Sequence, residues 1–240
     1  MSNKAKGVLW LACLAIAGLS TASATSVTIG SANDGNCYPF NCNDSGSASG
    51  QSIEYQQVYD GSLFSGPVSI TSVTFFDQFL PGFGFANVPL LAGTYQFTFA
   101  VTNKAVNGLS TNLASNITSG QALFLTTTTA GLAAGFSTLS FNGTTPYVFD
   151  PSSGNLLLDV TVTNQANVSS ASYSPANGFD ADDTGISTSR AYKIGAQTGV
   201  ADSVGLVTQI DFNSAVPEPG TWMLLGAGLT VLAGFRRRSR

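Results

Sequence analysis

Histidine is absent from this chain of 240 residues. Its absence excludes the Ser–His–Asp triad, the Cys–His pair and zinc sites with imidazole ligands. Catalysis would therefore depend on carboxylates, as in a glycosidase whose two carboxyl groups face each other across a cleft. The carboxylates available on candidate strands and turns are Glu54, Asp60, Asp77, Asp150, Asp159 and Asp211. No spacing selects a pair, so we expect no enzyme and keep a carboxylate-based glycan hydrolase as the least favoured alternative.

Charged residues are also scarce, at 9% of the chain. Residues 25–215 contain three basic and twelve acidic residues, which gives a net charge of −9. No basic patch is available to neutralise phosphates, so we expect no nucleic-acid partner. Ser, Thr, Asn and Gly supply the polar surface instead, which is typical of secreted bacterial β-proteins and suits a hydrated polysaccharide matrix.

The amino-terminal end has the three parts of a secretory signal peptide. Lys4 and Lys6 form a basic region, residues 8–19 form an apolar region, and Ala22-Ser23-Ala24 is a small-residue cleavage site. We therefore expect a signal-peptide helix over residues 1–24, with cleavage after Ala24 and export of the chain from Thr25 onward.

Cysteine occurs three times, and Cys13 lies within the predicted signal peptide. Cys37 and Cys42 remain, in a chain that we expect to reach an oxidising compartment, where disulfides form. Two thiols are too few for a structural metal site. The sequence favours a Cys37–Cys42 disulfide that shapes a local turn, with free thiols as the alternative.

No window between residues 25 and 215 shows a helical stripe of apolar residues. Alternation of apolar and polar residues instead predicts short strands separated by Gly, Asn and Pro turns. The predicted strands span residues 25–29, 51–59, 68–79, 94–101, 121–129, 138–141, 147–149, 156–163, 191–194 and 206–212. This pattern indicates an all-β domain over residues 25–215, with a β-sandwich or jelly-roll-like architecture.

The carboxyl-terminal end combines a rigid turn, an apolar segment and a basic tip. Val216, Pro217, Glu218 and Pro219 form an extended piece that cannot begin a helix early, because proline fixes φ and lacks an N–H. Residues 221–235 are apolar or small, and we expect a single transmembrane helix here, somewhat short for an average bilayer. The basic stop consists of Arg236, Arg237, Arg238 and Arg240, which would remain inside by the positive-inside rule.

This arrangement over residues 216–240 resembles the PEP-CTERM sorting signal of Gram-negative bacteria. An ordinary single-pass anchor, the alternative, does not need the Val-Pro-Glu-Pro piece. The Leu-Pro-x-Thr-Gly motif of the cell-wall sortase signals is absent from this chain. The resemblance implies recognition by exosortase, a membrane protease, and cleavage near Pro217–Pro219 that removes the helix and the arginines.

The resemblance also implies a cellular route and a role. An exported precursor would be anchored transiently in the inner membrane and would then reach the cell envelope, the surface or the extracellular space. The role would be structural or adhesive, in association with exopolysaccharide or biofilm. The alternative is a carbohydrate-binding or calcium-dependent adhesion module.

Two further features concern that alternative. In residues 177–185, Asp180 and Asp182 place oxygen ligands at alternate positions, as calcium loops do, although the bidentate Glu of an EF-hand is missing. A solvated acidic loop without a cofactor is the simpler interpretation. Tyr38, Phe40 and Tyr173 are aromatic residues that could stack on sugars if they are exposed.

Overall fold

A computed structural model describes residues 24–42, 52–77, 88–166 and 178–215. Thr25–Asn213 forms one compact unit. Its strands are β1 Thr25–Ile29, β2 Asp34–Asn36, β3 Ile53–Tyr59, β4 Val68–Phe76, β5 Gly93–Thr102, β6 Ser119–Thr129, β7 Thr138–Phe149, β8 Asn155–Thr163, β9 Phe179–Asp182, β10 Thr188–Ile194, β11 Val200–Asp202, β12 Gly205–Leu206 and β13 Thr208–Ser214. Three 3₁₀ turns complete the elements, namely η1 Gly61–Leu63, η2 Leu113–Asn116 and η3 Pro151–Ser153. The all-β prediction is confirmed.

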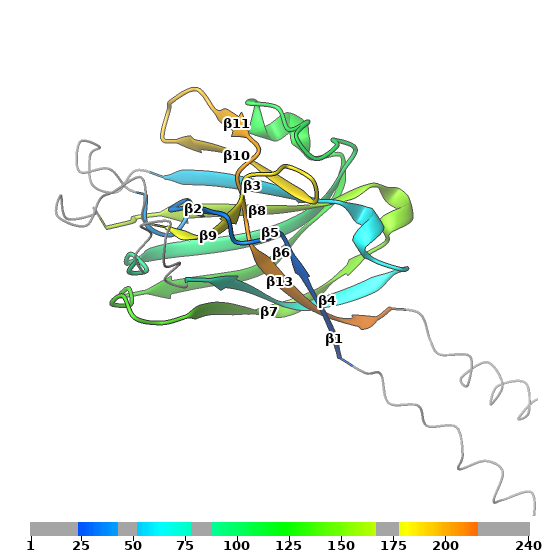
Figure 1. The fold of residues 1–240 in the computed structure, drawn as a ribbon, viewed down its shortest axis with the longest axis horizontal. Helices are drawn as coiled ribbons and strands as arrows, with labels where there is room; N and C mark the ends of the chain where they lie inside the picture. Colours follow the sequence, from blue (N-terminus) through cyan, green and yellow to red (C-terminus); the bar gives the residue numbers. More distant parts are fainter. Residues whose placement is uncertain (1–23, 43–51, 78–87, 167–177, 216–240) are drawn as a thin grey trace, which may run out of the picture. The chain divides into compact units, whose positions relative to one another are not determined.

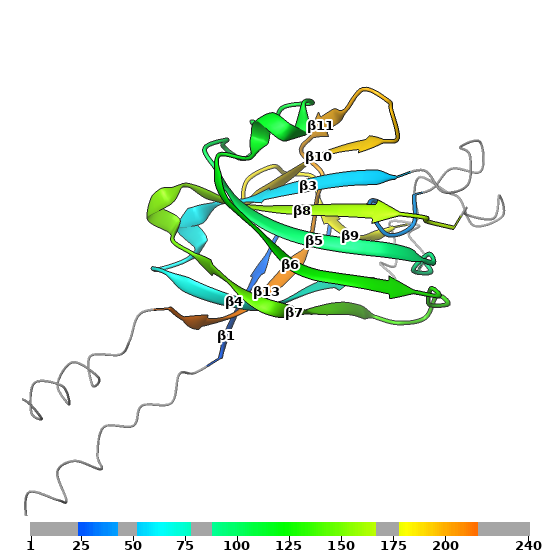
Figure 2. The same ribbon diagram turned by 180° about the vertical axis from the view of Figure 1, so that it is seen from behind.

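The strands form two large sheets and one small one. The large sheets have the strand orders β1-β13-β4-β7 and β11-β10-β3-β8-β5-β6, and the small sheet is β12-β9-β2. The six-stranded sheet lies over the four-stranded sheet in two opposite views (Figures 1 and 2). The two large sheets thus form the two layers that the sequence predicted, while the jelly-roll topology stays a prediction.

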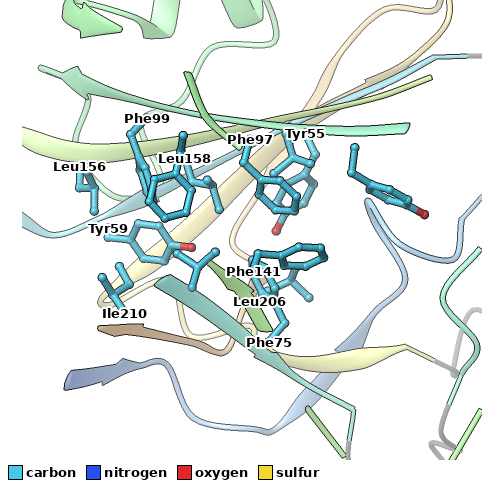
Figure 3. Packing of buried hydrophobic residues seen from close by; sticks show 14 of the residues in the cluster. Tyr55, Tyr59, Phe75, Phe97, Phe99, Phe141, Leu156, Leu158, Leu206 and Ile210 are labelled. Atoms are coloured by element: carbon cyan, nitrogen blue, oxygen red, sulfur yellow. The ribbon is translucent and has the colours of Figure 1, made fainter. Parts of the chain in front are cut away.

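Aromatic side chains from both layers fill the space between the sheets. Phe97 of β5 lies 4.3 Å from Phe141 of β7, measured between ring centroids. Phe97, Phe99 and Leu158 of the six-stranded sheet face Phe75, Phe141 and Ile210 of the four-stranded sheet (Figure 3). Each of these strands alternates apolar and polar residues, so one face enters the core and the other faces out. The period-two pattern therefore predicted the core faces correctly.

A smaller apolar cluster covers part of the other face of the six-stranded sheet. Leu109 and Leu113, from the segment that carries η2, pack on Val58, Leu157 and Ala191. Most side chains on the rest of that face are polar, among them Gln96, Thr126 and Thr161, and Leu123 is exposed opposite Thr98. This segment therefore divides the outer face into a covered part and an open part.

Some strands differ from their predicted extents. The predicted strands at 138–141 and 147–149 are one strand, β7, whose pairing with β4 shifts register between Ile70 and Ser72. The short strands β2, β9 and β11 were not predicted, because they have too few residues for an alternation to be recognised.

No helix in the described part of the chain is both long and apolar enough for a membrane crossing. The predicted transmembrane helix and the predicted signal-peptide helix, apart from Ala24, lie outside the described residues.

Candidate functional site at the Tyr38–Arg190–Tyr192 cluster

Two tyrosines and one arginine form a half-buried cluster beside the edge of the six-stranded sheet. Arg190 and Tyr192 alternate along β10 and therefore share one face of the strand. The ring of Tyr38 stacks on that of Tyr192, with the centroids 4.1 Å apart. The Cζ atom of Arg190 lies 5.0 Å from the centroid of Tyr192 and 5.9 Å from that of Tyr38. Both distances are within the range of a cation–π interaction.

Arg190 is held by the side chains of Asp202 and Asn36, which accept its hydrogen bonds. Its Nε donates to Oδ1 of Asp202 at 2.8 Å and its Nη2 donates to Oδ2 at 3.0 Å. Its Nη1 donates to Oδ1 of Asn36. Burial lowers the pKa of Arg190, but the bond to Asp202 and the nearby tyrosines outweigh this effect, so the pKa is raised. Arg190 is therefore a fixed cation in the cluster.

The loop closed by the disulfide positions Tyr38. Cys37 and Cys42 are joined in the structure, with their Cα atoms 5.1 Å apart. Between them, the Tyr38 N–H donates to Oδ1 of Asn36 at 2.9 Å. Phe40 is fully buried and packs against Phe75 at 4.9 Å between ring centroids. The loop thus inserts one ring into the core, where Phe40 cannot stack on a sugar, and holds another at the rim.

A polar cavity of about 170 Å³ adjoins Arg190. The lining residues are Asn107, Leu109, Ser189, Arg190, Ala201, Asp202 and Ser203. Asn107 has a φ of 62°, and its N–H donates to Oγ of Ser189 at 2.8 Å. Its side-chain amide donates to the carbonyl of Gly185 at 2.9 Å. Hydroxyl, amide and guanidinium groups are the combination that orients a small polar ligand, and neither tyrosine of the cluster lines this cavity.

The sequence contained one signal for this cluster that the prediction missed. Arg190 is one of only three basic residues between residues 25 and 215, and it alternates with an aromatic residue on the same strand. Of the candidate aromatics, Tyr38 belongs to the cluster, and Tyr173 lies outside the described residues. Asp202 and Asn36 could not be found, because nothing local in the sequence links them to Arg190.

The proposed calcium ligands lie on a buried strand instead of a solvated loop. Asp180 and Asp182 belong to β9, with exposed fractions of 5% and 4%. Oδ2 of Asp182 accepts from the N–H of Ser31 at 3.0 Å, and Oδ1 accepts from the N–H of Thr184 at 2.8 Å. Within the described ranges, no three acidic or cysteine side chains lie close enough to hold a metal ion. The solvated-loop interpretation is wrong, and calcium binding stays a hypothesis.

The candidate catalytic carboxylates are distributed over the fold. Asp60 and Asp150 cap η1 and η3 by accepting from the N–H groups of Ser62 and Ser152. Asp211 accepts from Ser72 and Gln209. These three carboxylates therefore have structural partners.

Glu54 and Asp159 are the two candidates that the fold places on one face of neighbouring strands. Glu54 pairs with Thr161 and Gln56 with Asp159 in the β3–β8 ladder. Asp159 is 7% exposed and accepts from Gln56 at 2.9 Å, and Glu54 bonds Lys193 at 2.9 Å. Asp159 is therefore nearly buried, although it lies on the face of β8 opposite the main core. Burial raises the pKa of Asp159 to about 6, with a smaller increase from Glu54.

Asp77 is a second buried carboxyl, at the end of β4. It has no exposed surface, and both of its carboxylate oxygens lie within 3.2 Å of the N–H of Val88. Burial raises the pKa of Asp77 to about 6, and the charge of Asp180 adds to this shift. Asp77 follows β4 of the four-stranded sheet, whereas Asp159 is on the face of the six-stranded sheet that points away from the main core, so they do not form a pair.

The two ends of the domain meet in one ladder. β1 pairs antiparallel with β13, and Thr25 lies opposite Phe212. Ala24, the last residue of the predicted signal peptide, is exposed. The sorting residues Val216, Pro217, Glu218 and Pro219, the four arginines of the basic stop, and Ala22 lie outside the described residues.

A comparison with protein-family models assigns the carboxyl-terminal end. Residues 215–238 match the PEP-CTERM protein-sorting motif. The predicted sorting signal is therefore confirmed, and the motif marks the chain for export, for processing by exosortase and for the cell surface or envelope. No curated protein and no solved structure matches the chain.

Proposed function

We propose that this chain, which carries a PEP-CTERM sorting motif, is a structural or adhesive component of the extracellular matrix and associates with exopolysaccharide. The motif accounts for its delivery to the cell exterior. The precursor would be held in the inner membrane by residues 221–235 until exosortase cleaves near Pro217–Pro219. The role after delivery is inferred from the surface of the sandwich.

The observation that supports this role is the chemistry of the open sheet faces. On the six-stranded sheet, Gln96 lies between Thr161 of β8 and Thr126 of β6. One row further along, the hydroxyl groups of Thr94 and Thr128 are 2.9 Å apart. Such rows present hydroxyl and amide groups at strand spacing, about 4.8 Å. They can exchange hydrogen bonds with the hydroxyl groups of a glycan at little desolvation penalty.

The four-stranded sheet also has polar side chains opposite its core face, of which Ser72 and Thr74 are only 8% exposed. Thr74 and Ser140 share a hydrogen bond of 2.8 Å between β4 and β7. Asp211 of β13 accepts from Ser72 and from Gln209. The large hydrophobic side chains that are exposed among the described residues are scattered and aliphatic, namely Leu63, Leu123, Leu132, Val148, Ile186 and Val200. Association through many weak polar contacts is consistent with a matrix component.

The experiment compares three forms of the chain in its native host. The wild-type protein should appear outside the cell and sediment with exopolysaccharide. A form truncated after Ala215 should be exported without passing through exosortase, and Glu218→Ala should test recognition of the motif. Loss of co-sedimentation after enzymatic removal of the polysaccharide supports the proposal, whereas equal sedimentation with and without polysaccharide contradicts it.

A second candidate function is carbohydrate binding at the Tyr38–Arg190–Tyr192 cluster. The stacked tyrosines support it, because sugar rings pack their C–H faces on aromatic rings. Arg190 contacts both rings and also lines the polar cavity, whose fixed polar groups could bond the edge of a sugar. Tyr192→Ala should abolish retention on a glycan column, and Tyr192→Phe should keep most of it. Equal retention of both variants and the wild type would remove this candidate.

A further inference from the structure

The outermost strand β1 has none of the features that usually protect a sheet edge. Among the strands that the structure describes it pairs with β13 alone, and it keeps one register over all five residues, from Thr25 opposite Phe212 to Ile29 opposite Thr208. Its sequence, Thr-Ser-Val-Thr-Ile, has no charge and no proline. Thr25, Ser26 and Thr28 are exposed. An unpaired edge of this composition is a template for another strand.

The other outermost strands of the two large sheets are protected. β7 contains Pro146, and its ladder with β4 has a register shift. The ladder of β6 with β5 shifts register twice, and β6 also lies beside β7 (Figures 1 and 2). β11 has three residues, one of which is Asp202, bonded to Arg190. Short strands, proline, bulges and charges are the usual means of preventing edge pairing.

The main-chain groups of β1 that point outward can be identified. The carbonyl of Asp211 accepts from the hydroxyl of Thr71 on β4, so it points away from β1. Asp211 lies opposite Ser26, and in an antiparallel ladder such a pair exchanges no hydrogen bonds. The N–H and C=O groups of Ser26, and of Thr28 two residues later, therefore point to the open side.

We propose that β1 is the docking edge for a second copy of this chain, through antiparallel β1–β1 pairing about a two-fold axis at Val27. This register pairs all five residues and places Ser26 opposite Thr28 of the second copy, twice by symmetry. The N–H and C=O groups of Ser26 and Thr28 then form hydrogen bonds with those of Thr28 and Ser26 in the second copy. Val27 lies opposite Val27 of the second copy.

Charge favours a second copy at this edge over other places on the same domain. The region of residues 25–215 carries a net charge of −9, so two copies repel each other wherever their exposed carboxylates approach. The β1–β1 contact sets no charged residue opposite another, because the nearest carboxylate in the ladder, Asp211, lies one strand further in on each side. β-branched residues facing each other across the pair add to its stability.

The contact is small and the dimer is therefore weak. Two five-residue strands bury far less than the roughly 1,200 Å² of a stable interface. Precursor copies held in the same membrane have a high effective concentration, which favours a weak dimer. Only this argument rests on the proposed function, in which the precursor is held in the membrane. The pairing itself can be measured without exosortase.

The test uses the full chain in detergent, with Cys13→Ser to remove the unpaired thiol. Val27→Cys places a thiol at the two-fold axis, and we expect at least fivefold more disulfide-linked dimer on a non-reducing gel than for Val148→Cys. Val148 is a suitable control because it is 65% exposed on the protected edge β7. An equal yield for the two variants would overturn the proposal.

Two charge variants in the Val27→Cys background then test the register. Ser26→Asp with Thr28→Asp sets like charges opposite each other and should reduce the cross-linked fraction at least fivefold. Ser26→Asp with Thr28→Lys sets opposite charges in both pairs and should restore it. Equal cross-linking in both variants would show that the copies meet through another surface or that another partner is involved. This result would also overturn the proposal. All of these substitutions are on the outermost strand, and circular dichroism verifies that each variant is folded.

Discussion

Thr25 lies directly opposite Phe212, so the first residue after the predicted signal cleavage and a residue close to the sorting motif are neighbours in one sheet. β13, which contains Phe212, also lies between β1 and β4. The four-stranded sheet can therefore form only after nearly the whole domain has been synthesised. Pairings of such high sequence separation are slow to form, since the chain between them must be ordered first.

The β1–β13 pair should contribute measurably to stability through Ile29. This side chain is 2% exposed in the main core, and its replacement in Ile29→Ala leaves a cavity. We expect a loss of about 2–4 kcal/mol in the free energy of unfolding, measured by urea titration. Thr28→Ala, one residue earlier and exposed, should stay within about 0.5 kcal/mol. Equal effects of the two substitutions would contradict the alternation of exposed Thr28 and buried Ile29 along β1.

Two buried carboxyls should make the domain less stable as the pH rises from about 4 to about 6. The pKa values of Asp77 and Asp159 are both raised from 3.8 to about 6, chiefly by burial. Between these values the folded state binds more protons than the unfolded state, so stability falls with increasing pH and then levels off. Each group contributes roughly 2–3 kcal/mol to this fall.

Substitution by asparagine isolates this effect. Asp77→Asn removes the titration while keeping an oxygen that accepts from Val88, so it should weaken the pH dependence and stabilise the domain at pH 7. The double variant with Asp159→Asn should flatten the curve of melting temperature against pH over this range. A wild-type curve that rises from pH 4 to 6, unaltered by either substitution, would show that these carboxyls do not govern it.

Arg190 should not be replaceable by lysine. A lysine cannot form the two parallel bonds to Asp202 or stack on Tyr192 as a guanidinium does. We expect Arg190→Lys to lower the free energy of unfolding by about 1–3 kcal/mol, because Asp202 loses bonds but stays partly hydrated. A double-mutant cycle with Asp202→Asn measures the coupling, and additive effects would argue against the ion pair.

Asp182 should stabilise the domain whether or not calcium is present. Its carboxylate accepts from the N–H groups of Ser31 and Thr184, which Asp182→Ala leaves without these partners. We expect a loss of about 1–3 kcal/mol in EDTA and in millimolar calcium alike. The calcium-dependent adhesion alternative predicts instead a rise in wild-type melting temperature with calcium that Asp180→Ala removes.

Much of the fold was accessible from the sequence because β-strands have a local signature. The alternation in residues 94–101 and 156–163 predicted β5 and β8 and their core faces correctly. The segment containing Asp180 and Asp182 was interpreted incorrectly, because two acidic residues in four resemble a solvated loop. Their backbone is instead paired with β2 on one side and β12 on the other. A partner strand far away in the sequence overrode the local composition.

The sequence by itself determined the destination of this protein, its all-β class and the exclusion of histidine-dependent chemistry. A sorting motif, the composition and the periodicity are all properties of consecutive residues. They can therefore be recognised without knowledge of which strands are neighbours in the fold. Only the tertiary structure brought Tyr38, Arg190 and Asp202 together, placed β1 at an open edge and buried Asp77 and Asp159. Periodicity defines which face of a strand is apolar, but the partner of each strand depends on packing among segments that are distant along the chain.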